Sequence, residues 1–149
     1  MKKQSLLICV FVFSISTLFA QSIDKEIEAI KKIIQTAYVD GLQNKGSVAD
    51  IEQGFHPGFN LLGVRDNMLT KFPIYSWINS HKKRLAADPS PPTDEQKITC
   101  KFLDIDVTGN AAMAKIELYR NQQLLFTDYL QLYKFDEGWQ VVSKIYYRH

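Results

Sequence analysis

The stretch at residues 109–147, GNAAMAKIELYRNQQLLFTDYLQLYKFDEGWQVVSKIYY, decides the fold of this chain. Hydrophobic and polar residues alternate through most of it, and aromatic and β-branched residues are frequent, as is typical of a half-buried sheet. Two polar breaks, at residues 121–122 and 136–138, divide the stretch into three segments, and Gly138 gives the second break a good hairpin signal. The stretch therefore predicts three long strands joined by tight turns.

The alternation assigns the side chains of these strands to two faces. The residues predicted to share a face within each strand are Ala112, Ala114, Ile116 and Leu118; Leu124, Phe126, Asp128, Leu130 and Leu132; and Trp139, Val141, Ser143 and Ile145. Lys144 falls on the opposite face of the last strand, with Val142 and Tyr146. Both faces carry bulky residues, so we expect helices to cover one face and a second subunit to cover the other.

Residues 1–20 have the pattern of a secretory signal peptide. Lys2 and Lys3 precede an apolar run, and a more polar segment follows and ends at Ala20, where we expect cleavage. The run is short and interrupted by Ser and Thr, which disfavours a membrane span, although an uncleaved N-terminal anchor is an alternative. The sequence thus predicts a periplasmic or secreted protein, free of the membrane after cleavage, with a single domain at residues 21–149.

Charge and cysteine content narrow the range of function classes. Removing Lys2 and Lys3 leaves 16 of the 18 basic residues, which equals the 16 acidic residues. A near-neutral domain lacks the basic surface typical of nucleic-acid binding, so no nucleic-acid partner is expected. Cys100 is the only cysteine of the mature chain, which excludes an intrachain disulfide, and no Cys and His residues have zinc-site spacing. We therefore expect no metal site and no cofactor.

Helical periodicity replaces alternation in the first half of the mature chain. The residues that predict a long amphipathic helix at residues 22–42 are Ile23, Ile27, Ile30, Ile34, Ala37 and Tyr38. Ser47 has the capping-box pattern that opens a short second helix, and Pro73 suits the first turn of a third. A small hairpin is expected between the second and third helices, around residues 65–67.

The segment at residues 96–107 predicts one more strand, and its alternation changes phase. The residues before the change are Ile98, Cys100 and Phe102, and those after it are Leu103, Ile105 and Val107. A β-bulge near Phe102 and Leu103 would restore a single inward face and bend the sheet. A bent sheet roofed by helices encloses a pocket. The predicted fold is therefore α+β, a cone-shaped, curved, mainly antiparallel sheet with three helices packed on its concave face.

Five motifs give the chain a family resemblance. They are YVDG at residues 38–41, FHPGF at 55–59, DVTGNAAMAKIE at 106–117, DYLQLYK at 128–134 and GWQVVSKIYY at 138–147. In this order and spacing they resemble the putative lumazine-binding family of the nuclear transport factor 2-like superfamily. The likeness spans nearly the whole mature chain. It implies a small cone-shaped pocket domain, often dimeric through its sheet.

The resemblance also implies that catalysis must be considered, because the superfamily includes ketosteroid isomerase and SnoaL-like polyketide cyclases. Those enzymes hold a tyrosine late in the first helix that donates a proton to an oxyanion, and Tyr38 matches that place. Ketosteroid isomerase also needs a carboxylate base in the first short strand. The matching positions here are near Leu62 and Gly63, neither of which is a carboxylate. The isomerase mechanism is therefore not supported.

The candidate pocket residues are Tyr38, His56, Trp77, Asp128 and Lys144. A carboxylate among the leucines of its strand needs a partner, and Lys144 in the neighbouring strand could supply it for Asp128, as a structural ion pair or as a polar anchor for a ligand. His56 either lines the pocket mouth or is simply exposed. Trp77 either packs in the core or stacks on a flat ligand.

Three functions fit these observations, and no catalytic residue is assigned. The first is an exported domain that binds an unidentified small molecule in an apolar conical pocket. The second is a SnoaL-like enzyme of the isomerase, cyclase or dehydratase type, in which Tyr38 stabilises an oxyanion while His56 or Asp128 moves a proton. The third is a structural module that forms a homodimer through its sheet face and holds no ligand.

Overall fold

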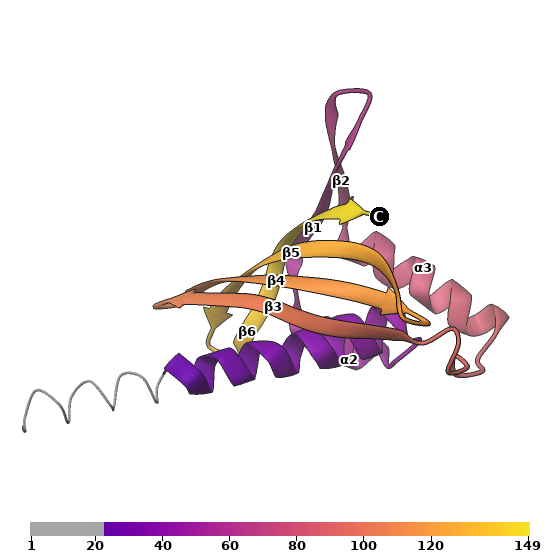
Figure 1. The fold of residues 1–149 in the computed structure, drawn as a ribbon, viewed down its shortest axis with the longest axis horizontal. Helices are drawn as coiled ribbons and strands as arrows, with labels where there is room; N and C mark the ends of the chain where they lie inside the picture. The colour runs from indigo at the N-terminus through magenta and orange to yellow at the C-terminus, as the bar shows by residue number, and fades with distance from the viewer. Residues whose placement is uncertain (1–22) are drawn as a thin grey trace, which may run out of the picture.

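The computed structural model describes residues 23–149, and the expected signal peptide lies outside the described residues. Six strands form one sheet in the order β2-β1-β6-β5-β4-β3, in which β1 and β6 are parallel and all other neighbours are antiparallel. The strands are β1 (Phe55–Arg65), β2 (Met68–Pro73), β3 (Ile98–Thr108), β4 (Ala111–Arg120), β5 (Gln123–Phe135) and β6 (Gly138–Arg148). The sheet is strongly curved, and the β1–β2 hairpin projects from the body of the molecule (Figure 1).

Helices cover the hollow side of this sheet, which confirms the predicted α+β cone. The first helix is α-helical at residues 23–33 and continues as the π-helical segment η1 (Ile34–Gln43). It runs along the sheet, while α2 (Val48–Gly54) and α3 (Ile74–Ala87) lie toward one end (Figure 1). The side chain of Ser47 accepts a hydrogen bond from the amide of Asp50, which confirms the predicted cap of α2.

The bend of the sheet comes from β-bulges, one of them predicted. In the β3–β4 pair the register shifts between Phe102 and Asp104, so Leu103 has no residue opposite and the inward face is restored beyond it. A second shift, between β5 and β6, leaves Val142 as the extra residue. Strict alternation in β6 is therefore wrong beyond Val141: Lys144 is buried on the helix side, and Ile145 is exposed.

The core lies between the first helix and the concave face of the sheet. Its fully buried apolar side chains include Phe55 and Phe59 from β1, Ile30, Ile34 and Leu42 from the first helix, Ile51 from α2, and Ile116, Leu118, Leu130 and Leu132 from β4 and β5. Burial of each such side chain contributes about 1.5–3 kcal/mol relative to exposure. At Gly54 a Cβ atom would lie 2.3 Å from the Cβ of Ala37, so this glycine is what lets α2 pack closely on η1.

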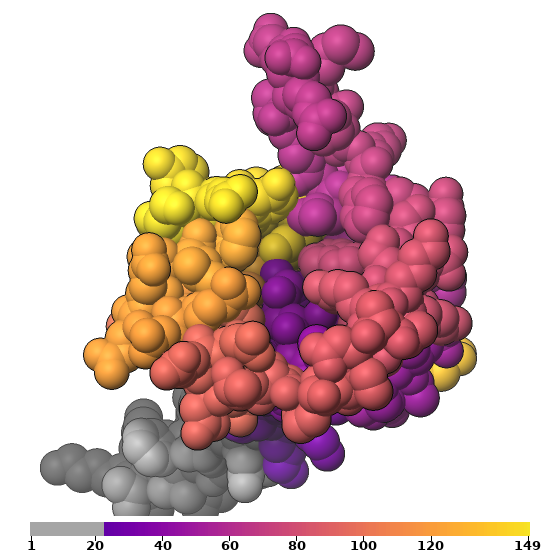
Figure 2. Space-filling model, turned by 90° about the vertical axis from the view of Figure 1, so that its right-hand side faces the viewer, coloured from indigo at the N-terminus to yellow at the C-terminus, as the bar shows by residue number. Residues whose placement is uncertain are grey.

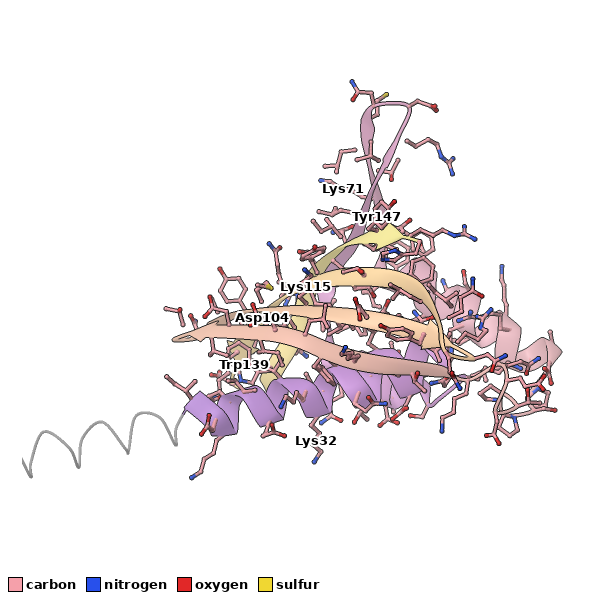
Figure 3. The ribbon with its side chains drawn as sticks, viewed as in Figure 1. Lys32, Lys71, Asp104, Lys115, Trp139 and Tyr147 are labelled. Carbon is pink, nitrogen blue, oxygen red and sulfur yellow. The ribbon has the colours of Figure 1, made fainter. Side chains whose placement is uncertain are left out.

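Both ends of the first helix are held to the sheet. At its start, Glu26 accepts hydrogen bonds from Lys134, at 2.6 Å, and from the indole of Trp139, at 2.7 Å. Figure 3 labels Trp139 beside the first turns of this helix. These hydrogen bonds, that of Lys134 first, lower the pKa of the Glu26 carboxyl. Past its other end, the Asn44 side chain donates to the carbonyl of Ile98 and accepts from its amide, both at 2.8 Å. These contacts fix the orientation of η1, which carries Tyr38.

Candidate functional site

A cavity of about 280 Å³ opens at the end of the cone where α3 lies. Its lining residues are Tyr38, Gln43, Leu61, Trp77, Phe126, Lys144, Tyr146 and Arg148. Figure 2 shows a hollow at this end, with the first helix (indigo) at its floor and the C-terminal strands (orange and yellow) on one side. The helices and the bent sheet thus leave a small chamber with mostly aromatic walls and a few polar groups, the usual character of a small-molecule site.

Three side chains from three elements meet beside this cavity, and we name Tyr38, Asp128 and Lys144 the inner triad. Tyr38 and Lys144 line the cavity, whereas Asp128 is fully buried behind them and is not a lining residue. The phenol of Tyr38 donates to Asp128 Oδ2 at 2.6 Å, and Lys144 Nζ lies 2.8 Å from the same oxygen. Lys144 Nζ also donates to the Tyr38 oxygen at 2.5 Å. Asp128 is 0% exposed and Lys144 is 4% exposed. The predicted pairing of Asp128 with Lys144 is confirmed, with Tyr38 as a third member.

The bulge in β6 is what brings the triad together. Leu130 of β5 lies opposite Lys144 of β6, and Asp128 lies opposite Tyr146, so Asp128 and Lys144 point to the same side from adjacent strands. Without the extra residue Val142, alternation from Val141 would turn Lys144 to the outer face. The third member of the triad, Tyr38, lies in the π-helical segment η1, and π-helical segments are often found at functional sites.

Burial shifts the proton equilibria of Tyr38 and Lys144. The pKa of Tyr38 is raised well above its ordinary value, first by burial and then by the neighbouring Asp128 carboxylate. Tyr38 therefore stays a neutral hydrogen-bond donor. The pKa of Lys144 is lowered by burial, against the opposing effect of Asp128. Burial, with a smaller effect of Asp128, raises the pKa of the nearby Cys100 thiol to about 12, so this cysteine is an unreactive thiol.

Aromatic rings surround the amine of Lys144. Its Nζ lies 4.8 Å from the centroid of the Tyr38 ring, 5.2 Å from that of Tyr146 and 5.9 Å from that of Trp77. Trp77 also meets Tyr38 edge to face at 5.9 Å. These rings stabilise a cation when Lys144 is protonated and offer flat apolar walls to a ligand.

The structure places the candidate His56, and also His81, outside the cavity lining. His56 is not among the lining residues: its ring stacks on Phe135 with centroids 4.7 Å apart, and its Nδ1 accepts the amide hydrogen of Gly58 at 3.0 Å. His81 is fully buried, with Nε2 2.9 Å from the carbonyl oxygen of Gly46. The geometry thus leaves a proton transfer in this cavity to Tyr38, Lys144 and Asp128 rather than to a histidine.

Sequence reasoning did not single out five of the lining residues, namely Gln43, Leu61, Phe126, Tyr146 and Arg148. Tyr146 was detectable, because it shares the parity of Lys144 in its strand. Nothing in the sequence marks Gln43 or Arg148, which reach the cavity only through the end of η1 and the tip of β6. Leu61, rather than Leu62 or Gly63, is the residue of β1 that lines the cavity.

Within residues 23–149, no group of three or more His, Cys, Asp or Glu side chains is placed to hold a metal ion. None of the helices that the structure describes has the length and apolarity needed to cross a membrane.

Comparison with known proteins identifies the family. The model of the family described as "putative lumazine-binding" matches residues 25–147. The chain belongs to this family. Among curated proteins, it is similar to the aldolase FrzH of Cladobotryum sp., with 31% identity over 120 residues that cover 78% of this chain and 89% of the aldolase.

Solved structures of other proteins share this fold. A nuclear transport factor 2-like protein of unknown function from Shewanella baltica OS155 is 28% identical, with a TM-score of 0.64 over 84% of this chain and 94% of that one. A second such protein, from Silicibacter pomeroyi DSS-3, is 21% identical, with a TM-score of 0.67 over 85% of this chain and 98% of that one. The fold of this family member is thus nuclear transport factor 2-like.

Proposed function

We propose that this domain binds a small carbonyl compound in the cavity and acts on it as an enzyme, making or breaking a carbon–carbon bond next to the carbonyl group in an aldol-type reaction. The observation that carries the proposal is the inner triad, in which a hydroxyl and an amine that line the cavity both contact a carboxylate buried behind them. Burying charged groups costs several kcal/mol, even when they are paired. A buried ionic cluster that also borders a cavity is therefore expected to have a chemical role in addition to a structural one.

An aldol-type reaction needs groups that the triad supplies. The carbonyl oxygen gains negative charge as the neighbouring carbon loses a proton or a carbon substituent, and a donor aimed at that oxygen stabilises the change. Tyr38 lines the cavity and remains protonated because burial raises its pKa. Lys144 lines the same wall and can accept or return a proton, while Asp128 holds both side chains in place.

The similarity to the aldolase FrzH supports this choice of reaction, since that protein is named for aldol chemistry and its match covers most of both chains. The size of the cavity, about 280 Å³, limits the bound part of a substrate to a small molecule or to one end of a larger one. The aromatic rings of Trp77 and Tyr146 favour a flat, partly apolar group beside the carbonyl.

Exchange of α-protons for deuterium tests the proposal without knowledge of the natural substrate. Pyruvate and glycolaldehyde are incubated with the protein in deuterated buffer, and the loss of the α-proton signal is followed by NMR. We expect catalysed exchange that Tyr38→Phe lowers about 10²-fold, the usual contribution of one acid–base group. Tyr119→Phe is the matched control, because Tyr119 also donates to a carboxylate at 2.6 Å, that of Glu117, but lies outside the cavity lining.

The other functions that fit the sequence predict different results. A binder without catalysis gives ligand-dependent thermal stabilisation but no exchange above the buffer rate. A structural module that holds no ligand gives neither. Equal exchange rates in the wild type and in Tyr38→Phe would contradict the proposed role of the triad.

A further inference from the structure

Lys144 combines two properties that its ion pair does not require. Its amine lines the cavity, so a bound molecule can contact it, and it is also almost wholly shielded from water at 4% exposure. An amine that only balances the charge of Asp128 has no need to border a ligand chamber. A primary amine in such a position can attack a carbonyl carbon, provided that it is neutral.

We propose that Lys144 is a covalent nucleophile, whose Nζ forms an imine with the carbonyl carbon of a small aldehyde or oxo acid bound in the cavity. The inference rests on the proposed function, because it specifies how the same cavity activates its carbonyl compound. It assigns Lys144 to bond formation, Tyr38 to proton transfer and Asp128 to holding the proton that Lys144 releases.

The buried pair offers a route to the neutral amine. Lys144 and Asp128 carry no net charge together, either as ammonium and carboxylate or as amine and carboxylic acid, and the 2.8 Å contact lets a proton pass between them. Burial disfavours the charged form, and it lowers the pKa of Lys144.

The covalent step balances with the groups present. The lone pair of Lys144 Nζ forms the C–N bond while the π electrons of the C=O bond move to oxygen, which takes the proton of the Tyr38 hydroxyl. Tyr38 regains a proton from the nitrogen through its 2.5 Å contact, which leaves a neutral carbinolamine. Tyr38 then protonates the hydroxyl group, water leaves as the nitrogen lone pair forms the C=N bond, and the remaining proton on the nitrogen returns to the Tyr38 oxygen. One amine and one carbonyl give one imine and one water, with no oxidant or reductant.

Arg148 points to oxo acids as the preferred class. It lines the cavity together with Lys144 and is exposed, so it lies toward solvent while the triad is buried. A guanidinium binds a carboxylate through two parallel hydrogen bonds. A small oxo acid could therefore place its carbonyl group at Lys144 and its carboxylate at Arg148, with Trp77 and Tyr146 along its sides.

Reductive trapping tests the inference on the intact wild-type chain. The protein is incubated with pyruvate or glycolaldehyde in the presence of sodium cyanoborohydride, and the modified lysines are located by peptide mass spectrometry. We expect one stable adduct at Lys144, formed more readily with pyruvate and at least about tenfold faster than any adduct at Lys115, because the Lys144 side chain is shielded from water in the cavity wall. Lys115 is the matched control, because it also lies over a tyrosine ring, at 5.4 Å from Tyr129, but on the other face of the sheet.

Two variants test whether the adduct requires Lys144. The peptide map of the wild-type chain alone is already enough to support or overturn the inference. Lys144→Arg should abolish the adduct and Lys115→Arg should leave it unchanged; if Lys144→Arg does not fold, the map of the wild-type chain still locates the reactive amine. Labelling spread over surface lysines, or no adduct at Lys144 with either probe, overturns the inference.

The trapping result and the exchange assay separate the two proposals. Catalysed α-proton exchange without an adduct would refute the imine and leave the aldol-type function standing, with Lys144 as a proton carrier. An adduct at Lys144 without exchange would support the imine and refute the aldol-type function. The absence of both would refute both proposals.

Discussion

The two faces of the sheet carry the same kinds of side chain in opposite surroundings. The inner triad joins a tyrosine, an acid and a lysine. The outer face of β4 and β5 carries the same kinds of side chain in two separate contacts, Tyr119 with Glu117 and Lys115 with Tyr129, and we name these four residues the outer cluster. The tyrosine–carboxylate hydrogen bond is 2.6 Å long in both. What differs is burial: Asp128 is fully buried, whereas Tyr129 is 37% exposed.

The difference shows that contact geometry alone does not create a reactive site. The pKa of Tyr119 is raised chiefly by its hydrogen bond to Glu117, whereas the pKa of Tyr38 is raised chiefly by burial. Solvent can replace a lost partner in the outer cluster but not in the inner triad. Matched substitutions on the two faces therefore measure how much of the triad's behaviour is due to burial.

The largest expected difference follows removal of the acid. Asp128→Ala leaves Lys144 without a carboxylate in a buried site and should lower the free energy of unfolding by about 3–5 kcal/mol. Glu117→Ala on the outer face should change it by no more than about 0.5 kcal/mol. Urea unfolding followed by tryptophan fluorescence measures both. Similar losses in the two variants would show that burial does not distinguish the faces.

Removal of the phenol hydroxyl should have the next largest effect. Tyr38→Phe keeps the ring that packs on Trp77 but removes the hydroxyl that bonds Asp128 and Lys144, which should cost about 1.5–3 kcal/mol, as for hydrogen bonds to charged groups. Tyr119→Phe should cost no more than about 0.5 kcal/mol. The same urea titration tests this pair, and a neutral effect of Tyr38→Phe would mean that the hydroxyl is no net part of the network.

The sequence predicted the cone because its patterns are local. Alternation in β4 and β5, helical spacing up to Gln43 and the phase change at Leu103 each depend on residues close in the chain. The Asn121–Gln122 turn lacks glycine, yet both residues adopt positive φ, at 46° and 63°, and complete the hairpin. Here the long flanking strands impose a turn that the local sequence only weakly favours.

The site was only partly predictable, because it depends on where distant elements meet. Asp128 among leucines signalled a buried carboxylate, and Tyr38 came from the resemblance to known enzymes. The inward direction of Lys144 depends on a bulge at Val142 that no phase change in the sequence reveals, since Val141 and Val142 fit either face equally well. His56 looked like a pocket residue by its position after α2, but its ring packs on Phe135 outside the cavity.

The contribution of Tyr38 to the free energy of unfolding should depend on pH. Because the pKa of Tyr38 is raised in the folded state, its proton stabilises the fold fully below the unfolded-state value near 10, and this stabilisation is lost as the pH rises above that value. The stability difference between the wild type and Tyr38→Phe should shrink by about 1.4 kcal/mol near pH 11. The opposite contribution of Lys144 is present in both proteins. Urea midpoints at pH 9 and pH 11 measure the change, and a constant difference would contradict it.

The smallest effect is expected on the outer face, which we propose is covered by a second copy of the chain. Tyr133 of β5 and Ile145 of β6 are 48% and 52% exposed on this face. The same two strands carry Asp128 and Lys144 on the inner face. Tyr133→Glu would place a charge among these apolar groups and should raise the dimer dissociation constant about fivefold, close to 1 kcal/mol. Tyr75→Glu, on the exposed side of α3, is the control and should leave it unchanged. Sedimentation equilibrium measures the dissociation constants of both variants. A wild-type chain that stays monomeric at high concentration would show that the outer face needs no partner. The contrast between the two faces would then be one of solvation alone.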